Sequence, residues 1–246
     1  MRYLILSDIH ANWEALLAVL ADARSRYDRI VCCGDIVGYG ADPDPVVQWV
    51  RANVNGVIRG NHDKACAGLE DLEWFNPLAR LSAEWTQTAV QPENIEYLRC
   101  LARGPERING FQILHGSPLD EDEYVLSEQD VAQVAPYLDC SVSFFGHTHV
   151  QGAFLCHRNG VKRLIAGDTN SGEWLLELEN DVNYLINPGS VGQPRDGDSR
   201  AAYAIYEPAA RQVSLYRAEY DVASAQKKIV DAGLPEVLAL RLGAGI

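Results

Sequence analysis

No cluster of lysine or arginine occurs anywhere in the chain, and its 34 acidic residues outnumber the 21 basic ones, which gives a formal net charge of −13. Affinity for a nucleic-acid backbone or for an anionic membrane depends on clustered basic side chains. We therefore expect neither a nucleic acid nor a membrane surface as a general partner of this protein.

Long apolar runs are also absent, because no stretch approaches the roughly 20 apolar residues that a membrane-spanning helix needs. Near the amino terminus, residues 3–6 are apolar, but polar Ser7 and Asp8 follow at once. Such a run is too short for the apolar core of a secretion signal and instead predicts a first β-strand. We expect a soluble protein.

The six cysteines are scattered and do not suggest a disulfide framework; Cys32 and Cys33 lie inside an apolar stretch, where they are typical of small buried residues. A reducing, cytoplasmic compartment is therefore expected. A content of 47% hydrophobic and 22% charged residues is typical of a packed globular protein, and 246 residues are compatible with one α/β domain.

The first sixty residues alternate between strand and helix patterns. Short apolar runs at 29–33 and 57–59 follow the one at 3–6, and helical apolar spacing separates them, with Asn12 as the cap of the first helix. This order predicts βαβ units with parallel strands.

The rest of the chain changes character twice. Residues 64–107 predict a helical insertion, since helix starts occur at Asn76-Pro77 and at Pro92, within a single domain of residues 1–246. Beyond residue 150, short β segments predict largely antiparallel hairpins, and a helix is expected after Asp221. The expected β segments are 153–156, 161–166, 174–178, 184–186, 202–206 and 213–216.

Polar side chains follow each early strand at the point where it ends. Asp8 and His10 follow the first strand, Asp35 the second, and Asn61 with His62 the third. Ligands gather at the carboxyl ends of parallel strands, so we expect these residues to lie close together.

Two later strands end in the same way. His115-Gly116 follows the apolar run 111–114, and Gly146-His147-Thr148-His149 follows the run 143–145, with Gly146 allowing a sharp bend. Only His157, of the six histidines, lies elsewhere.

With these five blocks in this order, the chain resembles the calcineurin-like metallophosphoesterase superfamily. The resemblance implies an α/β fold in the form of a four-layer αββα sandwich, with two mixed β-sheets flanked by helices. It also implies two divalent metal ions with shared ligands. The ligands of one metal would be Asp8, His10, Asp35 and His149, and those of the other Asp35, Asn61, His115 and His147.

The chemistry of these residues agrees with such a centre. Two nearby cations repel each other, so a bridging carboxylate is needed, and Asp35 is placed to provide it. Imidazole and carboxylate ligands without cysteine suit Mn²⁺, Fe or Zn²⁺ rather than a structural zinc-thiolate site.

The activity that the resemblance implies is hydrolysis of a phosphomonoester or phosphodiester by a hydroxide that bridges the two metals. His62 would face the substrate beside Asn61 as proton donor or phosphate contact. Asp63 is expected to fix the imidazole of His62 and keep it protonated. Arg195 follows a glycine- and proline-rich turn and could contact a substrate phosphate. The glycines and prolines are also explained by a turn with a purely structural role.

Two other functions remain open. The first is a metal-binding scaffold or sensor of the same fold without turnover, which the presence of His62 disfavours because a scaffold needs no proton donor. The second is an unrelated binuclear hydrolase acting on amides or lactams. Asn61 as a ligand and the placement of Asp8 and Asp35 at parallel strand ends disfavour this reading.

Overall fold

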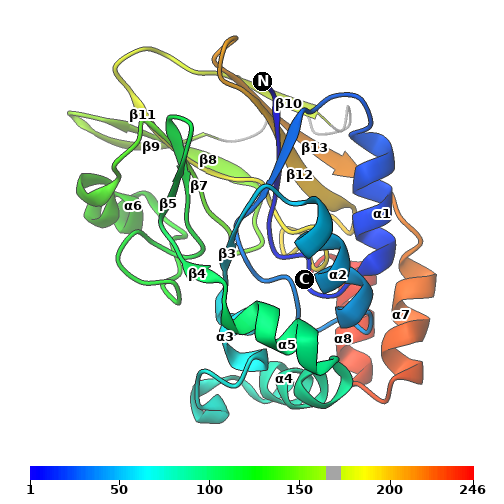
Figure 1. Ribbon diagram of the computed structural model, residues 1–246. Helices are drawn as coiled ribbons and strands as arrows, with labels where there is room; N and C mark the ends of the chain where they lie inside the picture. The colour runs from blue at the N-terminus through cyan, green and yellow to red at the C-terminus, as the bar shows by residue number, and fades with distance from the viewer. Residues whose placement is uncertain (165–172) are drawn as a thin grey trace.

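The computed structural model describes residues 1–164 and 173–246. Two mixed β-sheets pack face to face, with α1, α7 and α8 beside the first and α6 beside the second (Figure 1). The first sheet has the order β10 (Glu173–Glu177), β13 (Gln212–Ala218), β12 (Ala201–Glu207), β1 (Tyr3–Leu6), β2 (Arg29–Cys32), β3 (Gly56–Arg59), β4 (Ala102–Arg103). The second has the order β5 (Glu106–Ile108), β6 (Phe111–Ile113), β7 (Val142–Phe144), β11 (Asn183–Asn187), β8 (Gly152–His157), β9 (Gly160–Leu164). The predicted α/β fold with two mixed sheets and helices is confirmed.

The helices begin where the side chains predict. Asn12 caps α1 by accepting a hydrogen bond from the backbone N–H of Ala15, and Asn76 caps α4 in the same way. Proline occupies the first turn of α2, α4 and α5. The helices are α1 (Trp13–Asp22), α2 (Pro43–Asn53), α3 (Asn61–Cys66), α4 (Pro77–Ala89), α5 (Pro92–Arg99), α6 (Glu128–Val134), α7 (Val222–Asp231) and α8 (Glu236–Ala244), with short 3₁₀ turns at Leu72–Trp74 and Ala135–Tyr137.

Alternate residues of β1 point into two different cores, which explains its uninterrupted apolar sequence. Tyr3 and Ile5 pack between the sheets, whereas Leu4 and Leu6 pack under the helices. Tyr3 meets Phe111 of the second sheet edge-on, with ring centroids 4.9 Å apart. Strands β1, β2 and β3 pair in parallel, as predicted, so their carboxyl ends share one edge of the sheet.

The pairing of the later strands differs from the expected hairpin sheet. The hairpin β12–β13 joins the first sheet, because β12 pairs antiparallel with β1, and β10 extends that sheet through β13. In the second sheet, β7 lies in parallel between β6 and β11. The end of the predicted strand 161–166 lies outside the described residues.

Residues 64–107, predicted as a helical insertion, contain α4 and α5 and then two unpredicted strands. Strand β4 pairs with β3 of the first sheet, and β5 pairs with β6 of the second. The segment therefore ends by passing from one sheet to the other. Helix α8 was also not predicted. Among the described residues, no helix is long and apolar enough to cross a membrane.

Candidate active site

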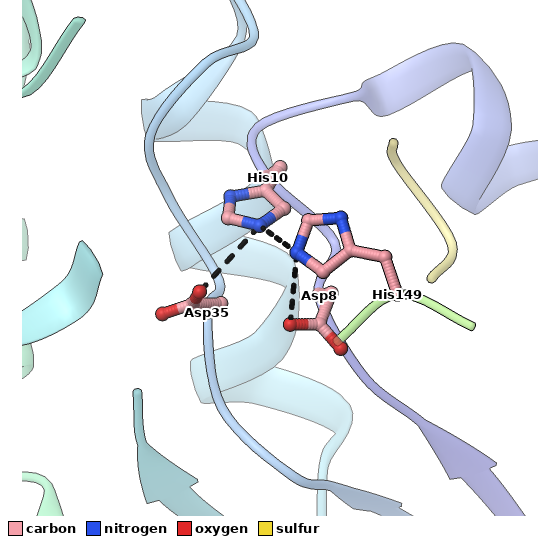
Figure 2. Close-up of side chains that lie close together, drawn as sticks. All are labelled: Asp8, His10, Asp35 and His149. Carbon is pink, nitrogen blue, oxygen red and sulfur yellow. Dashed lines mark hydrogen bonds and ion pairs between the residues drawn. The ribbon is translucent and has the colours of Figure 1, made fainter. Parts of the chain in front are cut away.

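Two buried groups of aspartate and histidine lie where the parallel strands end, and they share Asp35. Within each group, one possible ligand atom from every residue lies within 4.8 Å of the others. The first group, drawn in Figure 2 with its side chains turned toward one another, is Asp8, His10, Asp35 and His149. The second is Asp35, His115 and His147. We call them the first and second clusters.

The backbone at these residues is strained in a common way. Asp8, His10, Asp35, His147 and His149 all have φ between +49° and +64°, the left-handed region that non-glycine residues rarely adopt. Each such residue costs on the order of 1–3 kcal/mol. The strands stop at these positions because the chain turns there, and the turns direct the side chains into one place.

Two glycines allow the loops to approach the carboxylates. A Cβ on Gly146 would collide with Ser7 Oγ and lie 2.7 Å from Asp8 Oδ2, and one on Gly60 would overlap Asp35 Oδ1. Gly146 was predicted to provide a sharp bend, but the left-handed conformation falls on His147 and His149. The need for glycine at 146 therefore comes from close contact.

Hydrogen bonds to backbone carbonyls fix the tautomers of three histidines. Nδ1 of His10 donates to Val37 O over 2.9 Å, Nδ1 of His149 to Gln193 O over 2.6 Å, and Nδ1 of His115 to Cys33 O over 2.8 Å. In the neutral form of each ring, the single proton is therefore at Nδ1, and Nε2 has a free lone pair.

The lone pairs of His10 and His149 converge without a donor between them. Nε2 of His10 lies 3.0 Å from Nε2 of His149, an arrangement that is repulsive for two neutral rings. Burial, the main cause, lowers the pKa of both rings. Neither ring therefore readily takes a second proton, and a cation between the two nitrogens would relieve their repulsion.

Two carboxylate oxygens of the clusters also lack a partner. Asp8 Oδ2 and Asp35 Oδ2 are buried without a hydrogen-bond partner. Asp35 Oδ2 lies 3.5 Å from Nε2 of His10 and 3.4 Å from Nε2 of His115, and thus between the clusters. Burial opposes charge on His115, yet the Asp35 carboxylate outweighs it and raises the pKa of His115 to about 10, so without a cation Asp35 attracts a proton to Nε2 of this ring. The residues fit two divalent cations bridged by Asp35.

Asn61 lies beside the second cluster, and a hydrogen bond fixes the tautomer of its member His147. Asn61 Oδ1 lies 3.2 Å from Nε2 of His115, and Nε2 of His147 donates to Asp122 O over 3.1 Å, which leaves Nδ1 of His147 with the free lone pair. The structure thus brings together all seven side chains that were predicted as ligands.

His62, near the start of α3, lies beside the two clusters and also lines a cavity next to the second one. Its backbone N–H donates to Asp35 Oδ1 over 2.8 Å, and its ring packs against the rings of His10, Tyr39 and Phe75. Burial lowers the pKa of His62 to about 4, and its Nδ1 has no hydrogen-bond partner.

The expected role of Asp63 is not what the structure shows. Its Oδ1 accepts hydrogen bonds from the backbone N–H groups of Ile36 and Val37, and its Oδ2 accepts one from Gly60. The carboxylate therefore fastens the loop after β2 to the start of α3. It does not hold the imidazole of His62. The pKa of His62 is also lowered, whereas a ring kept protonated would have a raised pKa.

Arg195 lies beside the first cluster, as its predicted role requires. Its backbone N–H donates to the carbonyl of His149, and its side chain donates to Gln193 Oε1 over 3.0 Å. The guanidinium carbon lies 5.6 Å from the ring centroid of Tyr39, and Nε is buried without a partner. The guanidinium group thus retains an unused donor near the site.

Three aromatic residues at the site were missed in the sequence. Tyr39, Phe75 and Tyr124 line a cavity of about 290 Å³ together with Asn61, His62 and His147. Tyr39 lies in Gly38-Tyr39-Gly40, a glycine-flanked turn that follows the Asp35 block and could have been noticed. Phe75 and Tyr124 lie in segments whose sequence carries no comparable signal.

Comparison with known proteins agrees with this geometry. Residues 1–211 match the model of the calcineurin-like phosphoesterase superfamily domain. An uncharacterized protein of Methanocaldococcus jannaschii is 39% identical over 248 residues, which cover 98% of this chain and 97% of that protein.

Solved structures are similar over the whole chain. A metallophosphoesterase from Sphaerobacter thermophilus is 41% identical, with a TM-score of 0.86 and coverage of 100% of this chain and 99% of the other. A hypothetical protein from Pyrococcus horikoshii OT3 has the same fold at 20% identity, with a TM-score of 0.78 and coverage of 100% and 98%. The chain therefore belongs to the calcineurin-like phosphoesterase superfamily, and its buried aspartate and histidine clusters form the metal-binding site.

Proposed function

We propose that this protein hydrolyses phosphomonoesters or phosphodiesters with two divalent metal ions, for which Mn²⁺, Fe and Zn²⁺ suit the ligands. The observation that carries the proposal is the pair of buried clusters that share Asp35, with lone pairs and unpartnered carboxylate oxygens directed at one another. Ions held there would activate a water molecule as nucleophile and offset the negative charge of the phosphoryl oxygens.

Three side chains of the proposed mechanism act on the substrate itself. Asn61 and His62 lie at the side of the second cluster that opens into the cleft, where an ester oxygen can reach them. His62 donates the proton that the departing alkoxide needs. Burial lowers the pKa of His62 to about 4, and the negative charge of a phosphate beside the ring would raise it.

Arg195 would bind a phosphoryl oxygen from the other side, and Arg195→Met tests this role. Loss of a hydrogen bond to a charged group costs about 1.5–3 kcal/mol, so kcat/KM should fall by about 10- to 150-fold, mainly through KM. Steady-state kinetics would measure the change. Arg107→Met, at a surface ion pair with Asp139, is the matched control. An unchanged KM in Arg195→Met would mean that Arg195 does not contact the substrate.

The proposed activity is tested with chelator-treated protein supplied separately with Mn²⁺, Fe²⁺, Zn²⁺ or Ni²⁺. At least one metal should restore hydrolysis of p-nitrophenyl phosphate or its bis ester. The same metal should raise the melting temperature, because binding at 100 times Kd adds about 2.7 kcal/mol to the free energy of unfolding. Stabilisation without any hydrolysis would instead support the scaffold or sensor function. If none of the metals raised the melting temperature, that result would contradict a metal site.

A further inference from the structure

The cleft beside the second cluster has aromatic walls. Tyr39, Phe75 and Tyr124 line it; the rings of Tyr39 and Phe75 pack against that of His62, and the ring of Tyr124 packs against that of His147. The ring of Tyr39 lies 4.4 Å from that of His62 between centroids, and the ring of Tyr124 lies 4.0 Å from that of His147 with an interplanar angle of 34°. We call this space the aromatic cleft.

Tyr124 is held in place although its side chain is half exposed. The loop that carries it accepts a hydrogen bond from Nε2 of His147 at the carbonyl of Asp122. Two ion pairs fasten the same loop to the first sheet and α3, one between Arg59 and Glu121 and one between Lys64 and Asp122. A large ring presented to solvent on a fastened loop is suited to contact a ligand rather than to fill a core.

The charged side chains that line the aromatic cleft are acidic. Glu70 and Asp122 belong to its wall, whereas no lysine or arginine of the described chain does. Lys64 lies behind them and is shared, with Nζ 3.1 Å from Glu70 and 2.7 Å from Asp122. A second phosphate entering this cleft would meet these carboxylates and no basic side chain among the residues that line it, which is unfavourable.

We propose that the aromatic cleft binds the leaving group of the ester and selects a planar ring that carries no further phosphate. This inference rests on the proposed function, because it requires the phosphate to lie between the clusters. His62 lines the cleft and packs on His10 of the first cluster, so a leaving oxygen that receives its proton from His62 departs toward the aromatic rings.

The size of the cleft limits the ring-bearing group. Its volume of about 290 Å³ lies just below the range of roughly 300–1,000 Å³ for small-molecule pockets. This space fits one nucleoside or one aryl group rather than an extended segment of a phosphoprotein. Nucleobases and simple aryl rings share the stacking chemistry, and the experiment separates them.

The test compares 1-naphthyl phosphate with glycerol phosphate, which has no ring, in the metal-loaded protein. Tyr124→Leu should lower the ratio of the two kcat/KM values by about five- to ten-fold, whereas Tyr124→Phe should keep it. Tyr137→Leu is the matched control, since Tyr137 is similarly exposed and lies away from the cleft in the 3₁₀ turn after α6.

A second measurement does not depend on turnover. In saturation-transfer NMR with metal-free protein, adenosine or 1-naphthol should receive signal from wild type and from Tyr137→Leu, and much less from Tyr124→Leu. Transfer to adenosine alone identifies a nucleoside as the preferred group, and transfer to both identifies planar rings in general.

The outcomes separate this inference from the function on which it rests. If wild type hydrolyses the esters but the ratio and the NMR signal are unchanged in Tyr124→Leu, the cleft does not bind the leaving group. If loaded wild type hydrolyses no ester at all, the proposed function fails, and the leaving-group assignment fails with it.

Discussion

His62→Ala is expected to lower kcat by about 10²- to 10⁴-fold, the usual contribution of a general acid, while metal content stays unchanged. The reason is that the imidazole of His62 packs beside the clusters but is not one of the seven converging side chains that we propose as ligands. The loss should be larger for an alkyl phosphate than for p-nitrophenyl phosphate, because a poor leaving group depends more on the donated proton.

Steady-state kinetics and elemental analysis of the same preparation check this prediction. His157→Ala is the control, since His157 is an exposed histidine at the end of β8. A rate equal to wild type would remove His62 from the mechanism. An equal loss for both substrates with full metal content would assign His62 to phosphate binding instead of proton transfer.

Asp35→Asn is expected to weaken the binding of both metals by more than about 100-fold, beyond the 10- to 100-fold typical of residues that only support a ligand. Asp35 is the member common to both clusters, and its Oδ2 lies within 3.5 Å of a histidine nitrogen from each. Asparagine keeps an oxygen to accept the hydrogen bond from His62 N–H but lacks the charge that offsets two cations.

Isothermal titration with Mn²⁺ measures both affinities, and turnover should fall below detection. Asp139→Asn, at an exposed carboxylate paired with Arg107, removes the same charge from a remote surface. If Asp35→Asn still bound two ions with wild-type affinity, Asp35 would not be the bridge.

The site could be predicted from the sequence because its residues occur at recognisable positions after strand patterns. Asp8, Asp35 and Asn61 lie two or three residues after the ends of short apolar strands, and parallel strands bring their ends to one edge, so convergence follows from the βαβ order alone. The late histidines needed the second sheet, whose β6 and β7 end at the same place.

What could not be predicted depends on contacts between distant segments. The pattern of apolar residues in β12 and β1 does not determine that these two strands pair with each other. Phe75 and Tyr124 come from loops that no pattern directs into the cleft. Asp63 was assigned to its sequence neighbour His62, whereas its carboxylate binds backbone N–H groups of a loop nearly thirty residues earlier.

Five residues of the two clusters adopt left-handed backbone conformations, which contacts between loops stabilise. Asp8, His10, Asp35, His147 and His149 adopt conformations that cost free energy in the isolated loops. Hydrogen bonds between the loops hold them, such as those from the backbone N–H of Asp8 to Gly34 O and from that of His147 to Asp8 Oδ1. These hydrogen bonds therefore hold the side chains of both clusters in place in this structure.

Anomalous diffraction from crystals of the protein grown with Mn²⁺ tests the central claim most directly. The account predicts two peaks about 3.5–4 Å apart, one on each side of the Asp35 carboxylate. The first should lie within ligand distance of Asp8, His10 and His149, and the second within ligand distance of Asn61, His115 and His147. No peak at Asp35, or a single ion bound there at saturating Mn²⁺, would contradict the binuclear centre.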